Sequence, residues 1–363
     1  MSKALYLMIG GFLGAGKTTA ILKFAHLLKS RGLRVGLITN DQSVGLVDSA
    51  VLANDQFPVE EITGGCFCCR FNSLIEAAGR LCRSTRPDVF IAEPVGSCTD
   101  LVATVSFPLR KIYGDEYHVA PLSVLVDPIR AERVLGLEQG RTFSSKVLYV
   151  YGKQLEEAEF IVINKCDLLS AERQEHLQTA LGRAYPQAQI LRVSARQGTG
   201  MEHWLDRITA AAAASESAPQ VDYDTYAEGE ALLGWLNASG ALKAAAGIDG
   251  NEFLRGLAAK IREALRGLEI AHLKMTLLPR EQGGDIGVLN LVRSDGVAEL
   301  SHVLKEPLST GELLVNLRAE GDPELLRRSV LDSLAACGCE VEVTNLEHFR
   351  PAKPQPAYRM AHI

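Results

Sequence analysis

A glycine-rich octapeptide near the N-terminus constrains the fold more than any other feature of the sequence. The segment Gly11–Thr18 reads GFLGAGKT and fits the pattern G-x-x-x-x-G-K-[ST] without substitution. It lies between an apolar run at 4–9, which predicts a strand, and residues 17–30, which predict a helix. Glycines let the backbone wrap closely around a phosphate, and the helix N-terminus adds partial positive charge. The motif therefore predicts a phosphate-binding loop at the carboxyl end of the first strand.

Residue chemistry assigns a role to each position of this loop. Lys17 would reach the β- and γ-phosphates of a nucleotide, and Thr18 would ligate the accompanying magnesium. Lys17 is also a candidate catalytic residue, because charge develops at those phosphates in the transition state. The other positions expected to contact nucleotide are Gly11, Gly14, Ala15, Gly16 and Thr19.

The remainder of the first 200 residues alternates short apolar runs with amphipathic stretches. Further strands are predicted at 34–39, 57–63, 87–92, 121–127, 158–163 and 189–193. Further helices are predicted at 71–84, 98–109, 129–138, 170–182 and 201–212. Such alternation favours parallel strands joined by crossover helices, so the sequence predicts an α/β P-loop NTPase domain with a mostly parallel sheet.

The pattern changes after about residue 225, where a second domain is expected. Strands are predicted at 230–237, 271–278, 286–292, 312–317 and 340–346, with helices at 251–267 and 323–336. This order suits a smaller α+β domain with a ferredoxin-like layout. The predicted division is a P-loop domain over 1–212, a linker over 213–228, the α+β domain over 229–350 and an extended tail over 351–363.

A second motif, Asn164–Asp167, reads NKCD and follows the apolar strand Phe160–Ile163. Guanine offers N1–H and N2–H2 on one edge, and the Asp167 carboxylate can accept both, whereas adenine offers no such pair of donors. Lys165 could lie along the ring of the base. After a phosphate loop, and at the end of a strand, the motif predicts GTP as the nucleotide.

A polar tripeptide, Ser194-Ala195-Arg196, follows the strand predicted at 189–193. Its backbone N–H groups could support the guanine base, and Ser194 is the candidate residue for that role. An ordinary polar turn is the alternative.

Two acidic residues lie between these motifs, each directly after a predicted strand. Asp41 could help to hold magnesium or another metal, and Glu93 could bind the magnesium shell or orient water, which makes Glu93 a candidate catalytic residue. Gly96 offers an N–H group that could sense the γ-phosphate. Either acid could instead cap a helix. Capping is the role expected for Asp127, because Pro128 follows it.

Three cysteines, Cys66, Cys68 and Cys69, follow Gly64-Gly65 between a predicted strand and a predicted helix. Thiolates so close together repel one another unless a cation compensates them. Soft sulfur ligands suit Zn(II) or Cu(I), and cobalt or nickel less specifically. Structural zinc sites usually have four protein ligands, and no obvious fourth lies nearby in the sequence. An incomplete shell suits a metal that is transferred, whereas a reactive thiol cluster is the redox alternative.

The other cysteines are expected to serve packing. Cys337 and Cys339 flank Gly338 at the end of a predicted helix and are expected to be buried small residues, with a second metal site as the alternative. The cysteines predicted to be structural are Cys82, Cys98 and Cys166.

Charge, hydropathy and cysteine usage limit the expected binding partners and cellular location of the protein. The net charge of -6 argues against nucleic acid or an anionic membrane as the main partner. No apolar run reaches the roughly 20 residues of a membrane span. Adjacent cysteines without a secretion signal favour reduced thiols, and hence a cytoplasmic location.

Together these motifs resemble the CobW-type GTPases, which are related to the nickel-accessory GTPases of urease and hydrogenase maturation. The segments that carry the resemblance are Gly11–Thr19, Gly64–Cys69, Glu93 with Gly96, and Asn164–Asp167. The resemblance covers the first 210 residues. It implies a GTP-dependent metal chaperone, with zinc the commonest metal and cobalt, for cobalamin synthesis, another. Carried over by position, it implies phosphate, magnesium, metal and guanine binding by Lys17, Thr18, the three clustered cysteines and Asp167.

The chain departs from the family pattern in three places. The usual N-E-F-G-E loop is replaced by Asn40–Val44, which loses one acid, and the usual E-T-T-G by Glu93–Gly96. The histidine-rich stretch of the family is missing from the sequence. These departures bear on the identity of the metal and the client more than on GTP hydrolysis.

We therefore expect a Mg-dependent GTPase that binds a transition metal through its CxCC motif and delivers it to a client metalloprotein recognised by the C-terminal domain. One alternative is a GTP-switch adaptor for a metalloenzyme or a corrinoid or cobalamin system, with the cysteines structural or redox-sensing. Another is a thiol-redox regulator. The expected cofactors are GTP, Mg2+ and Zn2+, with Co2+ or Ni2+ in place of zinc as alternatives, and a homodimer is left open.

Overall fold

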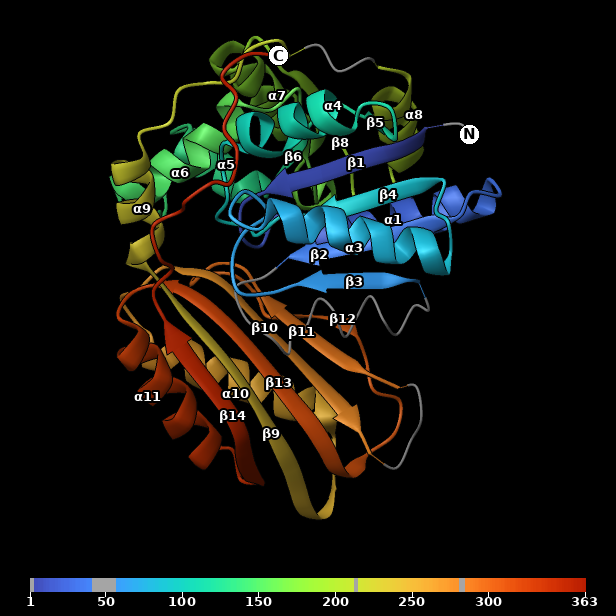
Figure 1. Ribbon diagram of the computed structural model, residues 1–363. Helices are drawn as coiled ribbons and strands as arrows, with labels where there is room; N and C mark the ends of the chain where they lie inside the picture. Colours follow the sequence, from blue (N-terminus) through green and yellow to red (C-terminus); the bar gives the residue numbers. More distant parts are fainter. Residues whose placement is uncertain (1–2, 41–56, 212–214, 281–284) are drawn as a thin grey trace. The chain divides into compact units, whose positions relative to one another are not determined.

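The structure of the protein is a computed structural model that describes residues 3–40, 57–211, 215–280 and 285–363 (Figure 1). These residues form two compact units. The first contains the described residues up to Tyr226 together with Lys353–Ile363, and the second contains Ala227–Ala352 as far as it is described. The C-terminal segment, expected as an extended tail, therefore returns to the first unit.

A sheet of parallel strands forms the centre of the first unit. Its strands are β1 (Ala4–Gly11), β2 (Val35–Asn40), β3 (Val59–Ile62), β4 (Val89–Glu93), β5 (Tyr117–Val119), β6 (Ser123–Val126), β7 (Phe160–Ile163) and β8 (Gln189–Arg192). They are ordered β3-β2-β4-β1-β6-β7-β8, with β5 beside the start of β1, and pair in parallel throughout the described residues. The predicted α/β P-loop fold is confirmed.

Helices cross between these strands. They are α1 (Lys17–Ser30), α3 (Phe71–Ser84), a π-helical turn (Val102–Ser106) that continues into α4 (Phe107–Tyr113), α5 (Pro128–Val134), α6 (Ser145–Glu156), α7 (Ala171–Ala184) and α8 (Met201–Ala210). Trp204 of α8 packs on Phe24 of α1 with ring centroids 4.3 Å apart, and its Nε1 donates a hydrogen bond of 3.0 Å to Ser123 of β6. These contacts fix α1, the helix that follows the phosphate loop, relative to the sheet.

Two helices of the first unit differ from the prediction. The sequence predicts no element at α6, because the β-branched and aromatic side chains of Val147–Tyr151 lower helix propensity. The helix forms because Val147, Val150 and Tyr151 are buried along one side of it. The helix predicted at 98–109 is wrong at its start, since regular structure begins only at Val102 and residues 94–100 form a loop.

The second unit is an antiparallel sheet with two helices. Its elements are α9 (Tyr223–Leu232), which leads in from the first unit, β9 (Leu233–Ile248), α10 (Gly250–Ala264), β10 (Ile270–Pro279), β11 (Gly287–Leu291), β12 (Glu299–His302), β13 (Leu308–Glu320), α11 (Pro323–Ala335) and β14 (Glu340–Phe349). The strand order is β12-β11-β10-β13-β9-β14, with antiparallel pairing. Without the β11–β12 hairpin the order of elements is βαββαβ, so the predicted ferredoxin-like layout is confirmed.

The core of the second unit lies between the helices and the sheet. Leucines of α10 and α11, among them Leu254 and Leu326, pack against strand residues such as Leu236, Leu273 and Leu317. The strand predicted at 230–237 is wrong at both ends. Its first residues belong to α9, and β9 continues through an alanine-rich stretch whose low strand propensity hides it in the sequence. In the described part of the chain, no helix has the length and apolar character to span a bilayer.

Candidate functional site

The carboxyl ends of six parallel strands carry the residues that the sequence singles out. Because the strands run in one direction, the segments that follow them meet at one edge of the sheet. These segments are the phosphate loop after β1, Asn40 at the end of β2, the cysteine loop after β3, Glu93 at the end of β4, Asn164–Asp167 after β7 and Ser194 after β8. Asp41 lies outside the described residues.

The phosphate loop turns tightly against the NKCD segment. Gly16 has a φ of 89°, and a Cβ at this position would lie 2.5 Å from Nδ2 of Asn164. The motif therefore needs glycine here for both conformation and space. Thr19 is exposed in the first turn of α1, directly after Thr18.

Lys17, Thr18 and Glu93 form a buried polar group beside this loop, each about 7% exposed. Nζ of Lys17 donates a hydrogen bond of 3.0 Å to the carbonyl oxygen of Gly11 and lies 3.9 Å from Oε1 of Glu93. The Thr18 hydroxyl donates to the same carboxylate oxygen at 3.2 Å. A hydroxyl and a carboxylate are hard oxygen donors of the kind that Mg2+ takes, so this pair fits a magnesium ion.

Gly96, three residues after Glu93, lies directly against the phosphate loop. A Cβ on Gly96 would lie 2.7 Å from Cδ2 and 3.1 Å from the backbone nitrogen of Leu13. Its carbonyl oxygen accepts a hydrogen bond of 3.0 Å from Nε2 of Gln154 on α6. The segment after β4 is thus packed on the phosphate loop and held from behind by α6.

Asn164 links three loops of the site. Its Nδ2 donates a hydrogen bond of 2.8 Å to the carbonyl oxygen of Ala15, and its Oδ1 accepts one of 3.0 Å from the N–H of Ala195. Both interactions are buried. The asparagine of the NKCD motif therefore positions the phosphate loop and the Ser194 segment relative to each other.

Lys165 and Asp127 form an ion pair that the sequence analysis does not anticipate. Nζ of Lys165 donates to Oδ2 of Asp127 at 2.8 Å and to the carbonyl oxygen of Gly14 at 2.7 Å. The expected capping role of Asp127 is confirmed, since its other oxygen accepts from the N–H of Arg130 at 3.1 Å. Asp167 lies exposed in a 3-10 turn two residues further on, which leaves its carboxylate at the surface of the site.

The Ser194 segment forms a compact turn. The N–H of Ser194 donates to the carbonyl oxygen of Thr199 at 2.9 Å, and its hydroxyl accepts from the N–H of Gln197 at 3.2 Å. The N–H of Ala195 is bound to Asn164, as described above. Two of the N–H groups expected to face a base are thus engaged inside the protein, and support of a base by Ser194 stays a prediction.

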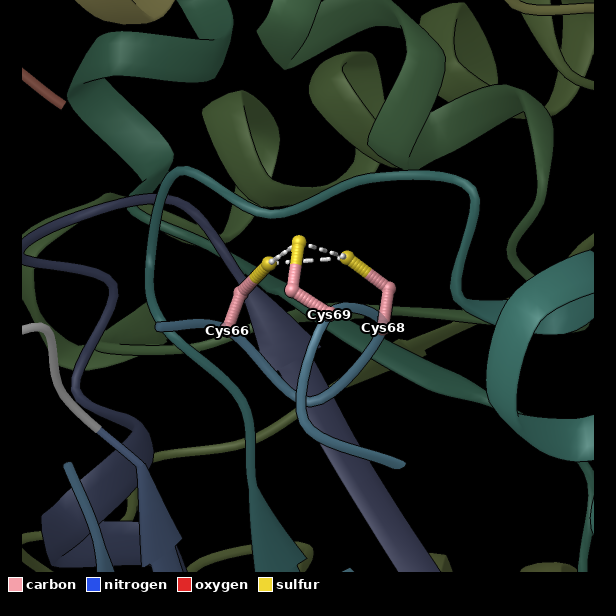
Figure 2. Close-up of side chains that lie close together, drawn as sticks. All are labelled: Cys66, Cys68 and Cys69. Carbon is pink, nitrogen blue, oxygen red and sulfur yellow. Dashed lines mark hydrogen bonds between the residues drawn. The ribbon is translucent and has the colours of Figure 1, made fainter. Parts of the chain in front are cut away.

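The cysteine loop gathers three sulfurs. The Sγ atoms of Cys66 and Cys68 are 2.8 Å apart, those of Cys66 and Cys69 3.3 Å, and those of Cys68 and Cys69 3.7 Å. Figure 2 shows the three side chains converging on one another. Within the described ranges, this is the one group of three or more potential metal-binding side chains with ligand atoms within 4.8 Å of one another. Three soft donors at one point fit a thiophilic metal ion.

Backbone turns hold these sulfurs together. The N–H groups of Cys69 and Arg70 both donate to the carbonyl oxygen of Cys66, at 3.1 and 2.9 Å. The Arg70 guanidinium donates to the carbonyl oxygen of Gly64. From β2, Nδ2 of Asn40 donates to the carbonyl oxygen of Gly65 at 2.7 Å, and this contact ties the cysteine loop to the neighbouring strand.

The three thiols do not ionise alike. Hydrogen bonds with Cys68, Cys69 and Cys98 hold the pKa of Cys66 well below its ordinary value. The same contacts with Cys66 raise the pKa of Cys68 well above that value and the pKa of Cys69 to about 11. Of the three thiols, Cys66 is therefore the one that loses its proton most readily, and Cys68 and Cys69 hold theirs more tightly.

Two parts of the site were missed by the sequence analysis. Cys98, expected to be structural, lies against the cluster and is 1% exposed. The C-terminal tail also reaches it, because the N–H of Gln355 donates to Sγ of Cys69 at 3.2 Å and the N–H of Ala357 to the carbonyl oxygen of Cys68 at 2.9 Å. Both contacts join segments far apart in the chain, and no local sequence signal marks them.

The cysteines of the second unit behave as packing residues. Cys337 and Cys339 are half-buried rather than buried, and both pack on the helix–sheet core. Sγ of Cys337 donates to the carbonyl oxygen of Cys339 at 3.6 Å. Neither belongs to the metal-ligating group found among the described residues.

Relatives of known kind match about half of the chain. A zinc-regulated GTPase metalloprotein activator 1 of Dictyostelium discoideum is 27% identical over 215 residues, which cover 51% of this chain and 44% of that protein. The zinc chaperone YeiR of Escherichia coli is 31% identical over 177 residues, covering 47% of this chain and 49% of that one. This chain therefore spans about half the length of the curated relatives it matches.

A solved structure and a family pattern also match the chain. The Zn(II)-bound YjiA GTPase from E. coli covers 92% of this chain and 99% of its own, at 15% identity and a TM-score of 0.40. The pattern of the CobW/HypB/UreG nucleotide-binding domain matches residues 5–192, which is more than half of the 363 residues. That range contains the phosphate loop, the cysteine loop, Glu93 and the NKCD motif. The chain belongs to the CobW/HypB/UreG family.

Proposed function

We propose that this protein is a Mg-dependent GTP hydrolase that binds zinc through Cys66, Cys68 and Cys69 and delivers it to a client metalloprotein. The observation that carries the proposal is the position of two sites at one sheet edge. A phosphate loop follows β1, and three cysteine sulfurs within 4.8 Å of one another follow β3 of the same parallel sheet. A phosphate loop alone would fit many functions, and the adjacent thiols are what points to a metal as cargo.

In this proposal, nucleotide turnover rests on positioned charge. The backbone of the phosphate loop would cradle the phosphates, and the buried ammonium of Lys17 would neutralise the charge that develops on them. Thr18 and Glu93, joined at 3.2 Å, would hold Mg2+, which polarises the phosphates when bound. Gly96 would respond to a γ-phosphate, which its close packing on Leu13 of the loop supports.

Guanine selection is assigned to the NKCD motif. The exposed Asp167 carboxylate would accept the two donors of the guanine edge, and Lys165, fixed by Asp127, would lie along the base. Asn164 would hold Lys165 and Asp167 at a fixed position relative to the phosphate loop, because its side chain is hydrogen-bonded to Ala15. Recognition of the base and of the phosphates would thus be linked by one buried side chain.

The metal role follows from the chemistry of the cluster. Three sulfurs satisfy most of the coordination of a zinc ion, and the similarity to proteins described as zinc chaperones supports zinc over cobalt or nickel. Recognition of the client falls to the second unit, which carries no part of the nucleotide or cysteine motifs within its described residues.

The test is transfer, measured on the purified full-length protein. Zinc-loaded protein is incubated with GTP, Mg2+ and a chromophoric zinc acceptor, and GTP hydrolysis is followed in parallel. We expect GTP to accelerate zinc release and the Lys17→Ala variant to lose both hydrolysis and acceleration. Lys23→Ala, an exposed lysine of the same helix, is the matched control. Unchanged turnover in Lys17→Ala would refute the nucleotide site, and zinc release indifferent to GTP would favour an adaptor role.

A further inference from the structure

The three clustered sulfurs leave a tetrahedral zinc ion one donor short. A fourth sulfur lies against them. Cys98, in the loop between β4 and the π-helical turn, is hydrogen-bonded through its thiol to Cys66 and lies within electrostatic reach of Cys68. Its side chain is 1% exposed, so solvent does not compete for it.

The backbone around Cys98 is held on both sides. Its carbonyl oxygen accepts a hydrogen bond of 2.8 Å from Nε2 of Gln154, and its N–H donates to the carbonyl oxygen of Val95 at 2.9 Å. The next residue, Thr99, donates its hydroxyl to Glu157 at 3.0 Å. Gln154 and Glu157 belong to or directly follow α6, so a helix fixes the loop that carries the sulfur. Metal ligands characteristically have such supporting partners.

We propose that Cys98 is the fourth sulfur ligand of the metal site and completes a four-thiolate shell with Cys66, Cys68 and Cys69. This inference rests on the proposed function, because it concerns the zinc that the three clustered cysteines would hold. Sulfurs around tetrahedral zinc are about 3.8 Å apart, given Zn–S bonds of about 2.3 Å. The sulfurs of Cys66 and Cys68 are closer than that, at 2.8 Å. The sulfur of Cys98 is not within 4.8 Å of all three others. On binding zinc, the short sulfur–sulfur distances would therefore lengthen and the long ones would shorten.

The position of Cys98 in the chain gives this ligand a second consequence. It lies two residues after Gly96, which packs on Leu13 of the phosphate loop. A movement of this segment caused by a γ-phosphate would therefore carry the fourth ligand with it. The other three ligands lie on a separate loop after β3. Loss of the γ-phosphate on hydrolysis could then change the metal from four-coordinate to three-coordinate by moving one short segment.

Two measurements on the full-length protein test the proposal. X-ray absorption of the zinc-loaded wild type should show four sulfurs at about 2.3 Å. Three sulfurs with one oxygen or nitrogen would overturn the proposal, and this measurement needs no variant. In the Co2+-loaded protein, Cys98→Ser should lower the sulfur-to-cobalt charge-transfer absorbance to about three quarters of the wild-type value, because one thiolate of four is lost.

Zinc affinities of variants distinguish a failure of the Cys98 proposal from a failure of the proposed metal site on which it rests. Cys98→Ser should weaken zinc binding by at least about 10-fold, and Cys82→Ser, a half-buried cysteine of α3, should not. Wild-type affinity and absorbance in Cys98→Ser, with metal binding lost in the triple Cys66/Cys68/Cys69→Ser variant, would overturn the fourth ligand alone. Full metal content in the triple variant would instead overturn the proposed metal site itself.

Discussion

The hydroxyl of Thr18 donates a hydrogen bond of 3.2 Å to Oε1 of Glu93, a residue 75 positions further along the chain. This contact joins the start of α1 to the end of β4. It places a phosphate-loop hydroxyl and a buried carboxylate where one Mg2+ could bind both. The parallel sheet is responsible, since β1 and β4 are neighbours in it.

The first prediction concerns this pair. Glu93→Gln keeps an acceptor for Thr18 but removes the negative charge, so Mg2+ should bind more weakly. We expect the Mg2+ concentration that gives half-maximal GTP hydrolysis to rise by roughly 10-fold, with a lower maximal rate. Hydrolysis measured across a magnesium series gives the answer, with Glu175→Gln on the exposed side of α7 as control. An unchanged magnesium requirement would remove Glu93 from the metal shell.

The second prediction concerns base selectivity. Asp167→Ala removes both acceptors for the guanine edge and leaves the donors of the base unpaired. The affinity for guanine nucleotides, GDP included, should fall by about 2–4 kcal/mol, or roughly 30- to 1000-fold. Fluorescent GDP and ADP analogues measure the difference, and Glu172→Ala, on the adjacent helix, is the control. Equal affinity of the wild type for the two analogues would contradict the guanine assignment.

The third prediction concerns the pH dependence of zinc binding. Cys68 and Cys69 have raised pKa values, that of Cys69 at about 11, so both are protonated near neutral pH and must lose their protons when zinc binds. Affinity should therefore rise with pH between about 6 and 9, because protons compete with the metal for these sulfurs. Zinc titrations in buffers of different ionisation enthalpy should report at least two protons released, one from each thiol of this pair. Affinity independent of pH would mean that other groups bind the metal.

The elements next to motifs were predictable because their signals are local. The phosphate loop and α1 follow from Gly11–Thr18 and the periodicity behind it, and α3 begins at Phe71, where the prediction places it. The parallel sheet follows from alternation alone. α6 was not predictable, because burial of its apolar side against the rest of the fold overrides the low helix propensity of Val147–Tyr151.

The site was predictable only as far as its residues stand in motifs. The motif residues of four separate loops meet because every strand of the sheet points the same way. Cys98 was interpreted as structural because nothing near it in the sequence resembles a ligand pattern. The backbone N–H of Gln355, in the tail, bonds Cys69, which lies 286 positions earlier in the chain. Because the contact is made by the backbone, no pattern of side chains in the sequence predicts it. Partners of this kind are set by tertiary packing, which a single sequence does not show.

The fourth prediction concerns this tail. Arg359 donates to Asp100 at 2.8 Å, and the Tyr358 ring packs on Phe71 at 5.2 Å between centroids. Arg359→Ala removes the ionic anchor, so Cys69 should be shielded less. The rate at which a thiol reagent labels Cys69 in the metal-free protein, read by mass spectrometry, should rise several-fold. Arg359→Lys, which keeps the charge, should label at close to the wild-type rate. Equal rates in all three proteins would show that the tail does not shield the cluster.

The last prediction concerns coupling between metal and nucleotide. Each site contacts a segment at the end of a central strand: Asn40 at the end of β2 bonds the cysteine loop at Gly65, and Gly96, after β4, packs on Leu13 of the phosphate loop. A γ-phosphate that orders these segments should change the geometry of the sulfurs. Zinc should therefore bind one nucleotide state more tightly, by about 1–3 kcal/mol or roughly 5- to 150-fold. We expect tighter binding in the GTP state, because hydrolysis would then release the metal for delivery.

The coupling is measured as zinc affinity in the GDP form and with a non-hydrolysable GTP analogue, both with magnesium. Gly96→Ala supplies the structural test, because its Cβ would lie 2.7 Å from Leu13 and force the segment away from the phosphate loop. The ratio of the two affinities should shrink towards one in this variant. Gly182→Ala, on α7 and with room for a methyl group, should keep the wild-type ratio. Equal zinc affinity in both nucleotide states of the wild type would mean that GTP hydrolysis does not drive zinc release. The nucleotide site and the cysteine site would then be neighbours at one edge of the sheet with no coupling between them.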